Sequence, residues 1–250
     1  MNIIVCGGAG GIGKEIALLL CEKHKVAILD IDKLALSKIS SEYENILCLE
    51  VDITNYEEVK KVILKVNSCF HEKIDAIINF AAVIERGNFL DLTLDAWNRS
   101  LEVNIVGVYL IIREVLRGML KRRSGKIIFF SSTAAKVLEK NSNQLPYSLT
   151  KAGVSLMSKQ IVLDYAEYGI QSNIIVLGNT SYGMVRKGRN EVEYEQFIRN
   201  VVNGTPRGKM TNMKEIYKCV EYLLSENSEC ICGQEIILDG GFSIGRYFKN

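Results

Sequence analysis

Short apolar runs, each followed by a stretch that favours a helix, constrain the fold of this chain most strongly. These runs lie at residues 2–6, 25–29, 46–51, 74–79, 126–131, 171–177 and 234–238. Their apolar residues are nearly continuous rather than alternating, which is typical of parallel strands that are covered on both faces. The sequence therefore predicts an α/β fold with a seven-stranded, doubly wound parallel sheet and helices on both faces.

The stretches between the runs carry apolar residues at helical spacing. They predict helices at residues 11–22, 33–43, 56–70, 94–120, 148–168 and 212–225. The sequence has no internal repeat and only 2 prolines, so no linker divides it. We expect a single domain over residues 1–250, in which the least sheet-like stretch, residues 179–210, forms a lid over the substrate.

Composition excludes several classes of protein. A hydrophobic content of 48% excludes disorder as the main state. The charge balance, 31 − 29 = +2, argues against a nucleic-acid partner. The apolar runs are far shorter than the ~20 residues that span a bilayer, and the first residues lack the pattern of an export signal. The scattered 7 cysteines and the 2 histidines predict free thiols in the cytoplasm and no metal site.

The first apolar run ends in a glycine-rich turn that leads into a helix. Glycines allow the backbone to approach a phosphate closely, and the helix N-terminus offers unpaired N–H groups to a pyrophosphate. Position directly after a strand and before a helix is the context that a dinucleotide site requires. The candidate residues are Gly7, Ala9, Gly10, Gly11, Ile12 and Gly13.

Acidic residues end the second and third runs. Asp30 could accept hydrogen bonds from the adenosine ribose and would repel a 2′-phosphate. The next residue is Ile31, and the first basic residue after it is Lys33, so NAD is favoured over NADP. Asp52, followed by Ile53, could bind the adenine amino group or could simply start a turn.

A tyrosine and a lysine four residues apart share one face of a predicted helix at Tyr147 and Lys151. The strand before them ends in hydroxyls at Ser131 and Ser132, and Asn104 interrupts an otherwise apolar helix segment. A second pair with the same spacing, Tyr56 and Lys60, has no such setting and receives no function.

At these residues the chain resembles the short-chain dehydrogenase/reductase family, and the resemblance covers essentially the whole sequence. It is similar to 3-oxoacyl-carrier-protein reductases and to sugar, alcohol and steroid dehydrogenases, which implies a Rossmann fold. The matching residues are Gly7, Gly11, Gly13, Asn79, Phe80, Ala81, Ala82, Asn104, Ser132, Tyr147, Lys151, Gly233, Gln234, Asp239, Gly240 and Gly241.

The resemblance implies an NAD-dependent enzyme that transfers hydride between nicotinamide C4 and a secondary alcohol or ketone. Tyr147 would be the general acid and base, with a pKa lowered by the Lys151 ammonium. Lys151 would also bind the nicotinamide ribose, Ser132 the substrate oxygen, and Asn104 a relay water. The family also implies cofactor contacts at Asn79, Ala81, Gly178 and Thr180.

Several positions depart from the family pattern. Cys6 replaces a threonine, Phe80 and Ala82 alter the usual Asn-Asn-Ala-Gly run, and Leu177 replaces a proline before Gly178. The threonine that contacts the carboxamide is displaced, which leaves Thr180 or Tyr182 for that contact. The interval from Ser132 to Tyr147 is two residues longer than the family leads us to expect, which predicts an enlarged loop at residues 136–146 over the active site.

The sequence does not identify the substrate, and it leaves alternative functions open. Arg186, Lys187 and Arg189 could bind an anionic substrate or could form a solvated helix face. A catalytically weak dinucleotide-sensing or scaffold protein is the alternative function, and a sugar-nucleotide epimerase or dehydratase is a third. By resemblance, the long helices at 94–120 and 148–168 predict a homodimer or homotetramer. No membrane or nucleic-acid partner is expected.

Overall fold

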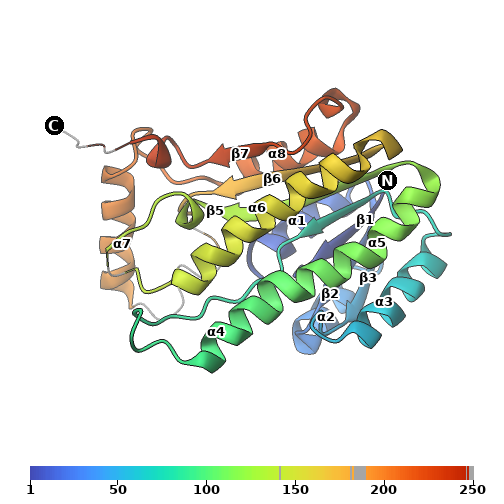
Figure 1. Ribbon diagram of the computed structural model, residues 1–250, viewed down its shortest axis with the longest axis horizontal. Coiled ribbons are helices and arrows are strands. Elements are labelled where there is room, and N and C mark those ends of the chain that lie inside the picture. Colours follow the sequence, from blue (N-terminus) through green and yellow to red (C-terminus); the bar gives the residue numbers. More distant parts are fainter. Residues whose placement is uncertain (141, 181, 183–189, 246, 248–250) are drawn as a thin grey trace.

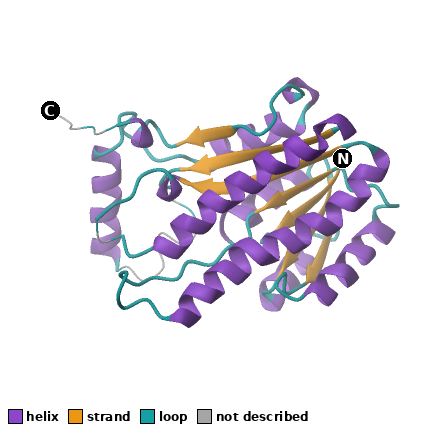
Figure 2. Ribbon diagram, in the orientation of Figure 1, coloured by secondary structure: helices purple, strands orange, loops and turns teal. Residues whose placement is uncertain are grey.

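The strands form one parallel sheet in a computed structural model of the chain (Figures 1 and 2). The structure describes residues 1–140, 142–180, 182, 190–245 and 247. The 7-stranded sheet has the order β3-β2-β1-β4-β5-β6-β7, and all its pairs are parallel. The strands are β1 (Asn2–Cys6), β2 (Lys25–Asp30), β3 (Ile46–Glu50), β4 (Ala76–Asn79), β5 (Gly125–Ser132), β6 (Ile170–Leu177) and β7 (Glu235–Leu238). The predicted fold class is therefore confirmed.

Helices cover both faces of the sheet, and each face has its own apolar core. The helices are α1 (Gly11–Cys21), α2 (Lys33–Glu42), α3 (Tyr56–Cys69), α4 (Leu94–Leu101), α5 (Val108–Arg122), α6 (Leu145–Tyr165), α7 (Glu191–Asn203) and α8 (Met213–Leu224). One core packs α3, α5 and α6 against the sheet, and the other packs α1, α2 and α8. Within the described part of the chain, no helix is long and apolar enough to cross a membrane.

The predicted long helix at 94–120 is interrupted. A π-helical turn, Glu102–Gly107, separates α4 from α5. At its centre Asn104 is buried, and its side chain bonds the backbone of Val83 instead of pointing to solvent. At its end Gly107 packs so closely on Ile53 that a Cβ would lie 2.7 Å from Cγ1 of that side chain. These tertiary contacts, which helical periodicity does not encode, account for the break.

Helix α7 falls inside the stretch for which the sequence predicted only a lid. It begins with a reciprocal cap in which Asn190 accepts from the N–H of Glu193, while the Glu193 carboxylate accepts from the N–H of Asn190. Asn-x-x-Glu is the signal that could have located this helix. Arg186, Lys187 and Arg189 lie outside the described residues.

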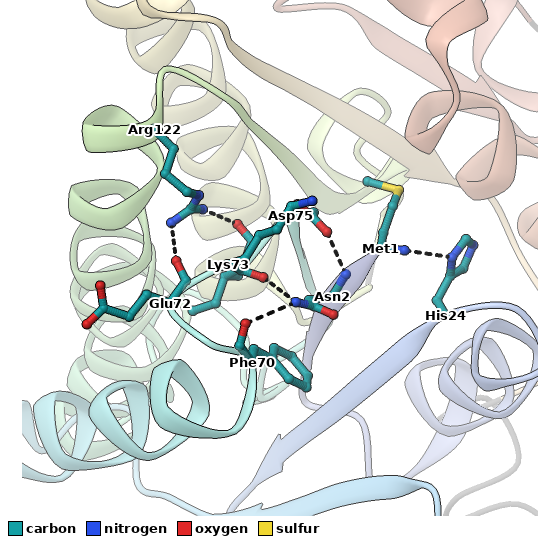
Figure 3. A network of polar contacts seen from close by, with 9 residues as sticks. Met1, Asn2, His24, Phe70, Glu72, Lys73, Asp75 and Arg122 are labelled. Atoms are coloured by element: carbon teal, nitrogen blue, oxygen red, sulfur yellow. Dashed lines mark hydrogen bonds and ion pairs between the residues drawn. The ribbon is translucent and has the colours of Figure 1, made fainter.

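The amino-terminal edge of the sheet is held by a polar network (Figure 3). The backbone N–H of Asn2 donates to the Asp75 carboxylate at 2.7 Å. Arg122 donates from its two Nη atoms to the carbonyls of Glu72 and Ile74, at 2.6 and 2.5 Å. These bonds fix the turn between α3 and β4, so Ile74 and Asp75 belong to the turn and β4 begins only at Ala76. The opposite, carboxyl edge of the sheet is left to form the site.

Candidate active site

A large cavity lies at the carboxyl edge of the sheet, where α/β folds bind their ligands. Its volume is about 1010 Å³, which is the size of a site for a large ligand. The predicted site residues that line it are Gly7, Ala9, Gly10, Gly11, Ile12, Gly13, Asp30, Asp52, Ile53, Ala81, Ser132, Tyr147, Lys151, Gly178 and Thr180. The structure thus brings together at one edge residues that are distributed over most of the sequence.

The glycine turn fits a dinucleotide. Gly7 has φ +73°, and a Cβ there would lie 2.4 Å from the backbone N of Ala81, so this glycine permits close backbone packing. At Gly13 a Cβ would lie 2.3 Å from the Gly7 carbonyl oxygen. At Gly10, by contrast, a Cβ would meet nothing within 4 Å, because this residue borders the cavity. Helix α1 begins there with no side-chain cap and no acidic residue in its first turn, which leaves its N–H groups for an anion.

Carboxylates line the end of the cavity at β2 and β3. The Oδ2 atom of Asp30 accepts from the N–H of Ala9 at 2.9 Å, which fixes this carboxylate beside the glycine turn. Asp32, the N-cap of α2, and Asp52 line the same end. Oδ1 of Asp52 accepts from both the N–H and the hydroxyl of Thr54, at 2.9 and 2.7 Å, so this residue starts a turn as well as lining the cavity.

The side chains of two adjacent serines at the end of β5 point in different directions. The buried Ser131 hydroxyl donates to the Lys151 carbonyl at 2.8 Å, which ties β5 to α6. The half-buried Ser132 lies on the Tyr147 side, and its Oγ accepts from the N–H of Ala134 at 3.1 Å. The pleat of the strand thus leaves Ser132 as the serine beside the tyrosine.

Burial controls the ionisation of Tyr147 and Lys151. It raises the pKa of Tyr147 to about 12, although a hydrogen bond with Ser132 acts to lower it. It lowers the pKa of Lys151 to about 8. The Lys151 ammonium donates to the Phe130 carbonyl at 2.8 Å and lies 5.6 Å from the centre of the Tyr147 ring. Desolvation thus outweighs the hydrogen bond with Ser132, and the lowering of the tyrosine pKa expected from the Lys151 ammonium together with an oxidised nicotinamide stays a prediction.

Two predicted residues lie outside the cavity lining. Asn104 is connected to the site by hydrogen bonds. Its Nδ2 donates to the Thr150 hydroxyl at 3.1 Å and to the Val83 carbonyl at 2.9 Å. Its Oδ1 accepts from the Val83 N–H at 2.7 Å. Asn79 is buried at the end of β4, and its Oδ1 has no hydrogen-bond partner in the described structure. Through Val83, which lines the cavity, the Asn104 side chain supports the cavity wall.

Sequence reasoning missed several lining residues. Phe197 comes from α7 and Phe242 from the turn after β7. Phe80 and Phe130 stack with ring centroids 4.0 Å apart, at the ends of two neighbouring strands. Gln144, the N-cap residue of α6, also lines the cavity. The residues that line the cavity beyond the motifs come from loops, strand ends and single positions of α4 and α7, whose packing a single sequence does not show.

A glycine turn of the kind that can bind a pyrophosphate, and a serine, a tyrosine and a lysine at the same sheet edge, are typical of nicotinamide-dependent oxidoreductases. The family model described as Enoyl-(Acyl carrier protein) reductase matches residues 7–243. The chain belongs to the short-chain dehydrogenase/reductase family. Members of this family bind a nicotinamide dinucleotide and act on alcohols and ketones.

Relatives match nearly the whole chain. Dehydrogenase/reductase SDR family member 6 of Aquarana catesbeiana is 30% identical over 245 residues, which cover 97% of each chain. The 2-keto-3-deoxy-L-fuconate dehydrogenase of Xanthomonas campestris is 31% identical over 96% of this chain and 79% of the relative. The ligand-free aldohexose dehydrogenase of Thermoplasma acidophilum superposes with a TM-score of 0.89 at 25% identity, over 100% of this chain and 96% of that one.

Proposed function

We propose that this protein is an NAD-dependent dehydrogenase that transfers hydride between nicotinamide C4 and a secondary alcohol or ketone, with Tyr147 as the general acid and base. One observation supports this most: Ser132, Tyr147 and Lys151 line the same cavity as the glycine turn. The nicotinamide would supply the hydride chemistry, and the residues of the chain would move the proton and orient the substrate. The relatives described above are named as dehydrogenases, which is consistent with this reaction.

The proton route follows from the ionisation of the site. With a pKa of about 12, the Tyr147 phenol is protonated at neutral pH and can donate to the oxygen of a ketone. Ser132 would hold the same oxygen. The Lys151 ammonium would stabilise the phenolate that forms and bind the nicotinamide ribose. Both N–H groups of the Asn104 side chain already donate hydrogen bonds. A relay water at this residue would therefore have to donate its own hydrogen to an oxygen atom of the π-helical turn.

A preference for NAD is supported by the charges at the adenosine end. Asp30, Asp32 and Asp52 would repel a 2′-phosphate. Lys33, the nearest basic residue in the sequence, forms an ion pair with Glu50 at 3.5 Å and is therefore partly neutralised. For the carboxamide of the nicotinamide, the candidates stay Thr180 and Tyr182, which both line the cavity and are joined by a 3.0 Å hydrogen bond from the Thr180 hydroxyl to the Tyr182 carbonyl.

The proposed enzyme consists of one domain, forms an oligomer and works in a reducing compartment. Residues 1–250 would act as a single domain, with residues 179–210 as a substrate lid, because Phe197 of α7 lines the cavity. An apolar stripe on the outer face of α6, Leu149, Leu156 and Leu163, would support a homodimer or homotetramer. The 7 free cysteines favour a reducing compartment such as the cytoplasm.

A substrate screen that follows NADH absorbance tests this function. We expect wild-type protein to oxidise at least one secondary alcohol with NAD⁺ and to prefer NAD⁺ over NADP⁺. The Asp30→Ala variant should lose about 10-fold or more of that preference, since it removes one charge that repels the 2′-phosphate. Binding of NADH without turnover of any alcohol or ketone would instead favour a dinucleotide-sensing protein. An unchanged cofactor ratio in the variant would show that Asp30 is not the selector.

A further inference from the structure

The charges that line the cavity differ between its two ends. Three carboxylates lie at the end near β2 and β3, as described above. Two arginines line the opposite end: Arg86 from the segment between β4 and α4, and Arg99 from α4 itself. This second end is also where Tyr147 and Lys151 lie. The substrate therefore meets a part of the cavity whose charged lining is largely basic.

Within the described parts of the chain, only one of these two arginines has a carboxylate partner. Nε of Arg99 lies 3.5 Å from the Glu85 carboxylate, which compensates its charge. Nη1 of Arg86 donates to the Ser142 carbonyl at 3.4 Å, and a neutral acceptor of this kind does not compensate a positive charge. Glu139 also lines this end, but among the described residues no ion pair joins a carboxylate to Arg86. The side chains outside the described residues include no Asp or Glu.

Backbone contacts hold Arg86 beside the catalytic helix. The neighbouring Gly87 donates its N–H to the Asn143 carbonyl at 2.9 Å and pairs with Gln144 in a short parallel bridge. Gln144 is the N-cap residue of α6, three residues before Tyr147. The main chain therefore places the backbone of Arg86 close to the N-terminus of α6, which carries Tyr147.

Apolar side chains contribute to the cavity wall beside the polar ones. Phe197 of α7 and Phe242 after β7 line the cavity, as does Val137. The aromatic residues belong to α7 and to the turn after β7, whereas the arginines belong to α4 and to the segment before it, so the two kinds of side chain reach the cavity from different elements. A matching substrate combines one anionic group with an apolar remainder.

We infer that Arg86 is a specificity-determining residue that binds the carboxylate of a hydroxy acid or oxo acid at the substrate end of the cavity. This inference rests on the proposed function. One guanidinium without a carboxylate partner matches one carboxylate, which it can bind through two parallel N–H donors. A phosphate monoester, with nearly two negative charges at neutral pH, would need a second cation, and among the described arginines of this end Arg99 is already paired with Glu85.

Matched substrate pairs test the inference. Each pair is a linear hydroxy acid of four to eight carbons and its N-methylamide, assayed with NAD⁺ by NADH absorbance. We expect wild-type protein to prefer the acids. Arg86→Gln should raise KM for the acids roughly 10- to 100-fold, since a charge-assisted bond is lost, with little change in kcat. The amides should be unaffected, and Arg86→Lys should restore part of the loss. Arg117→Gln, which alters an arginine paired with Glu114 outside the cavity, is the control.

A binding measurement separates this inference from the proposed function. In the NADH complex of the Tyr147→Phe variant, the acids should raise the melting temperature more than the amides do, and the additional Arg86→Gln change should remove that difference. Acids that stabilise no better than amides, or a difference that survives Arg86→Gln, would overturn the role of Arg86. Turnover of neutral alcohols by wild-type protein would leave the proposed function standing in that case.

Discussion

The proposed reaction needs the positive charge of Lys151, but the burial of this side chain disfavours its charged form. Its pKa is lowered to about 8, so the ammonium exists below that pH and is lost above it. We therefore expect the rate of ketone reduction to be constant at lower pH and to fall as the pH rises through about 8. The Lys151→Arg variant, if active, should lack this fall because a guanidinium stays charged.

The pH profile of kcat/KM with a ketone and NADH, measured for both proteins, checks this residue-scale prediction. Dead-end binding of NADH at each pH controls for changes in cofactor affinity. A wild-type rate that is flat from pH 7 to about 9.5 would show that the ammonium plays no part in the step. The sequence alone could not supply this pH range, because the burial that lowers the lysine pKa is a tertiary property.

At the scale of elements, one carboxylate joins three parts of the fold around the site. Glu235 of β7 forms ion pairs with Lys136, at the start of the loop 136–146, and with Lys159 of α6. Burial acts to raise the pKa of Glu235, but hydrogen bonds with Lys136 and Ser155 and the lysine charges outweigh it, so the pKa lies below its ordinary value. The carboxylate therefore stabilises the fold above the unfolded-state pKa of about 4.3, and this stabilisation is lost as the pH falls below it.

The Glu235→Gln variant should lower the free energy of unfolding by about 1–3 kcal/mol at pH 7, since two lysines lose their partly buried partner. Urea unfolding at several pH values checks this, and the difference from wild-type protein should shrink near pH 4. Glu195→Gln, which removes an exposed ion pair with Arg199, should change stability by only about 0.5 kcal/mol. Equal effects of the two variants would show that Glu235 contributes no more than a surface pair.

The helices and strands also show which features of the fold can be predicted from the sequence and which cannot. The seven strands could be predicted because buried parallel strands are apolar along their length, and the glycine turn and Tyr147 could be found because they are local motifs. The π-helical turn could not, because it depends on Asn104 reaching Val83, 21 residues earlier in the chain. Helix α7 was missed because its many charged residues resemble those of a solvated segment. Two further features do not follow from spacing: the raised pKa of Tyr147, and the position of Arg86 without a carboxylate partner among the residues that the structure describes.

At the scale of the whole molecule, an apolar stripe lies on the outside of α6. Leu149, Leu156 and Leu163 are seven residues apart and therefore share one face, with exposed fractions of 45%, 68% and 80%. Val106 and Tyr109, in and after the π-helical turn, are also exposed, and Figure 1 shows α5 beside α6. Contiguous exposed apolar side chains of this kind mark an interaction surface.

We expect wild-type protein to sediment as a dimer or tetramer at micromolar concentration. The Leu156→Asp variant should shift it towards the 28.0 kDa monomer, because the interface would have to bury a charge. Leu34→Asp, at a residue of α2 that is 76% exposed outside the stripe, is the matched control and should leave the assembly unchanged. Wild-type protein that sediments only at 28.0 kDa would contradict the proposed assembly.

The central claim is that Tyr147 exchanges a proton with the substrate, and the two tyrosine–lysine pairs of the chain allow a direct test. Tyr147→Phe should lower kcat at least about 100-fold while NADH affinity stays within about threefold, because only the hydroxyl that transfers the proton is removed. Tyr56→Phe breaks the hydrogen bond to Glu114 in the second pair and should leave turnover intact. Turnover that survives in Tyr147→Phe, measured beside unchanged NADH binding, would contradict the account.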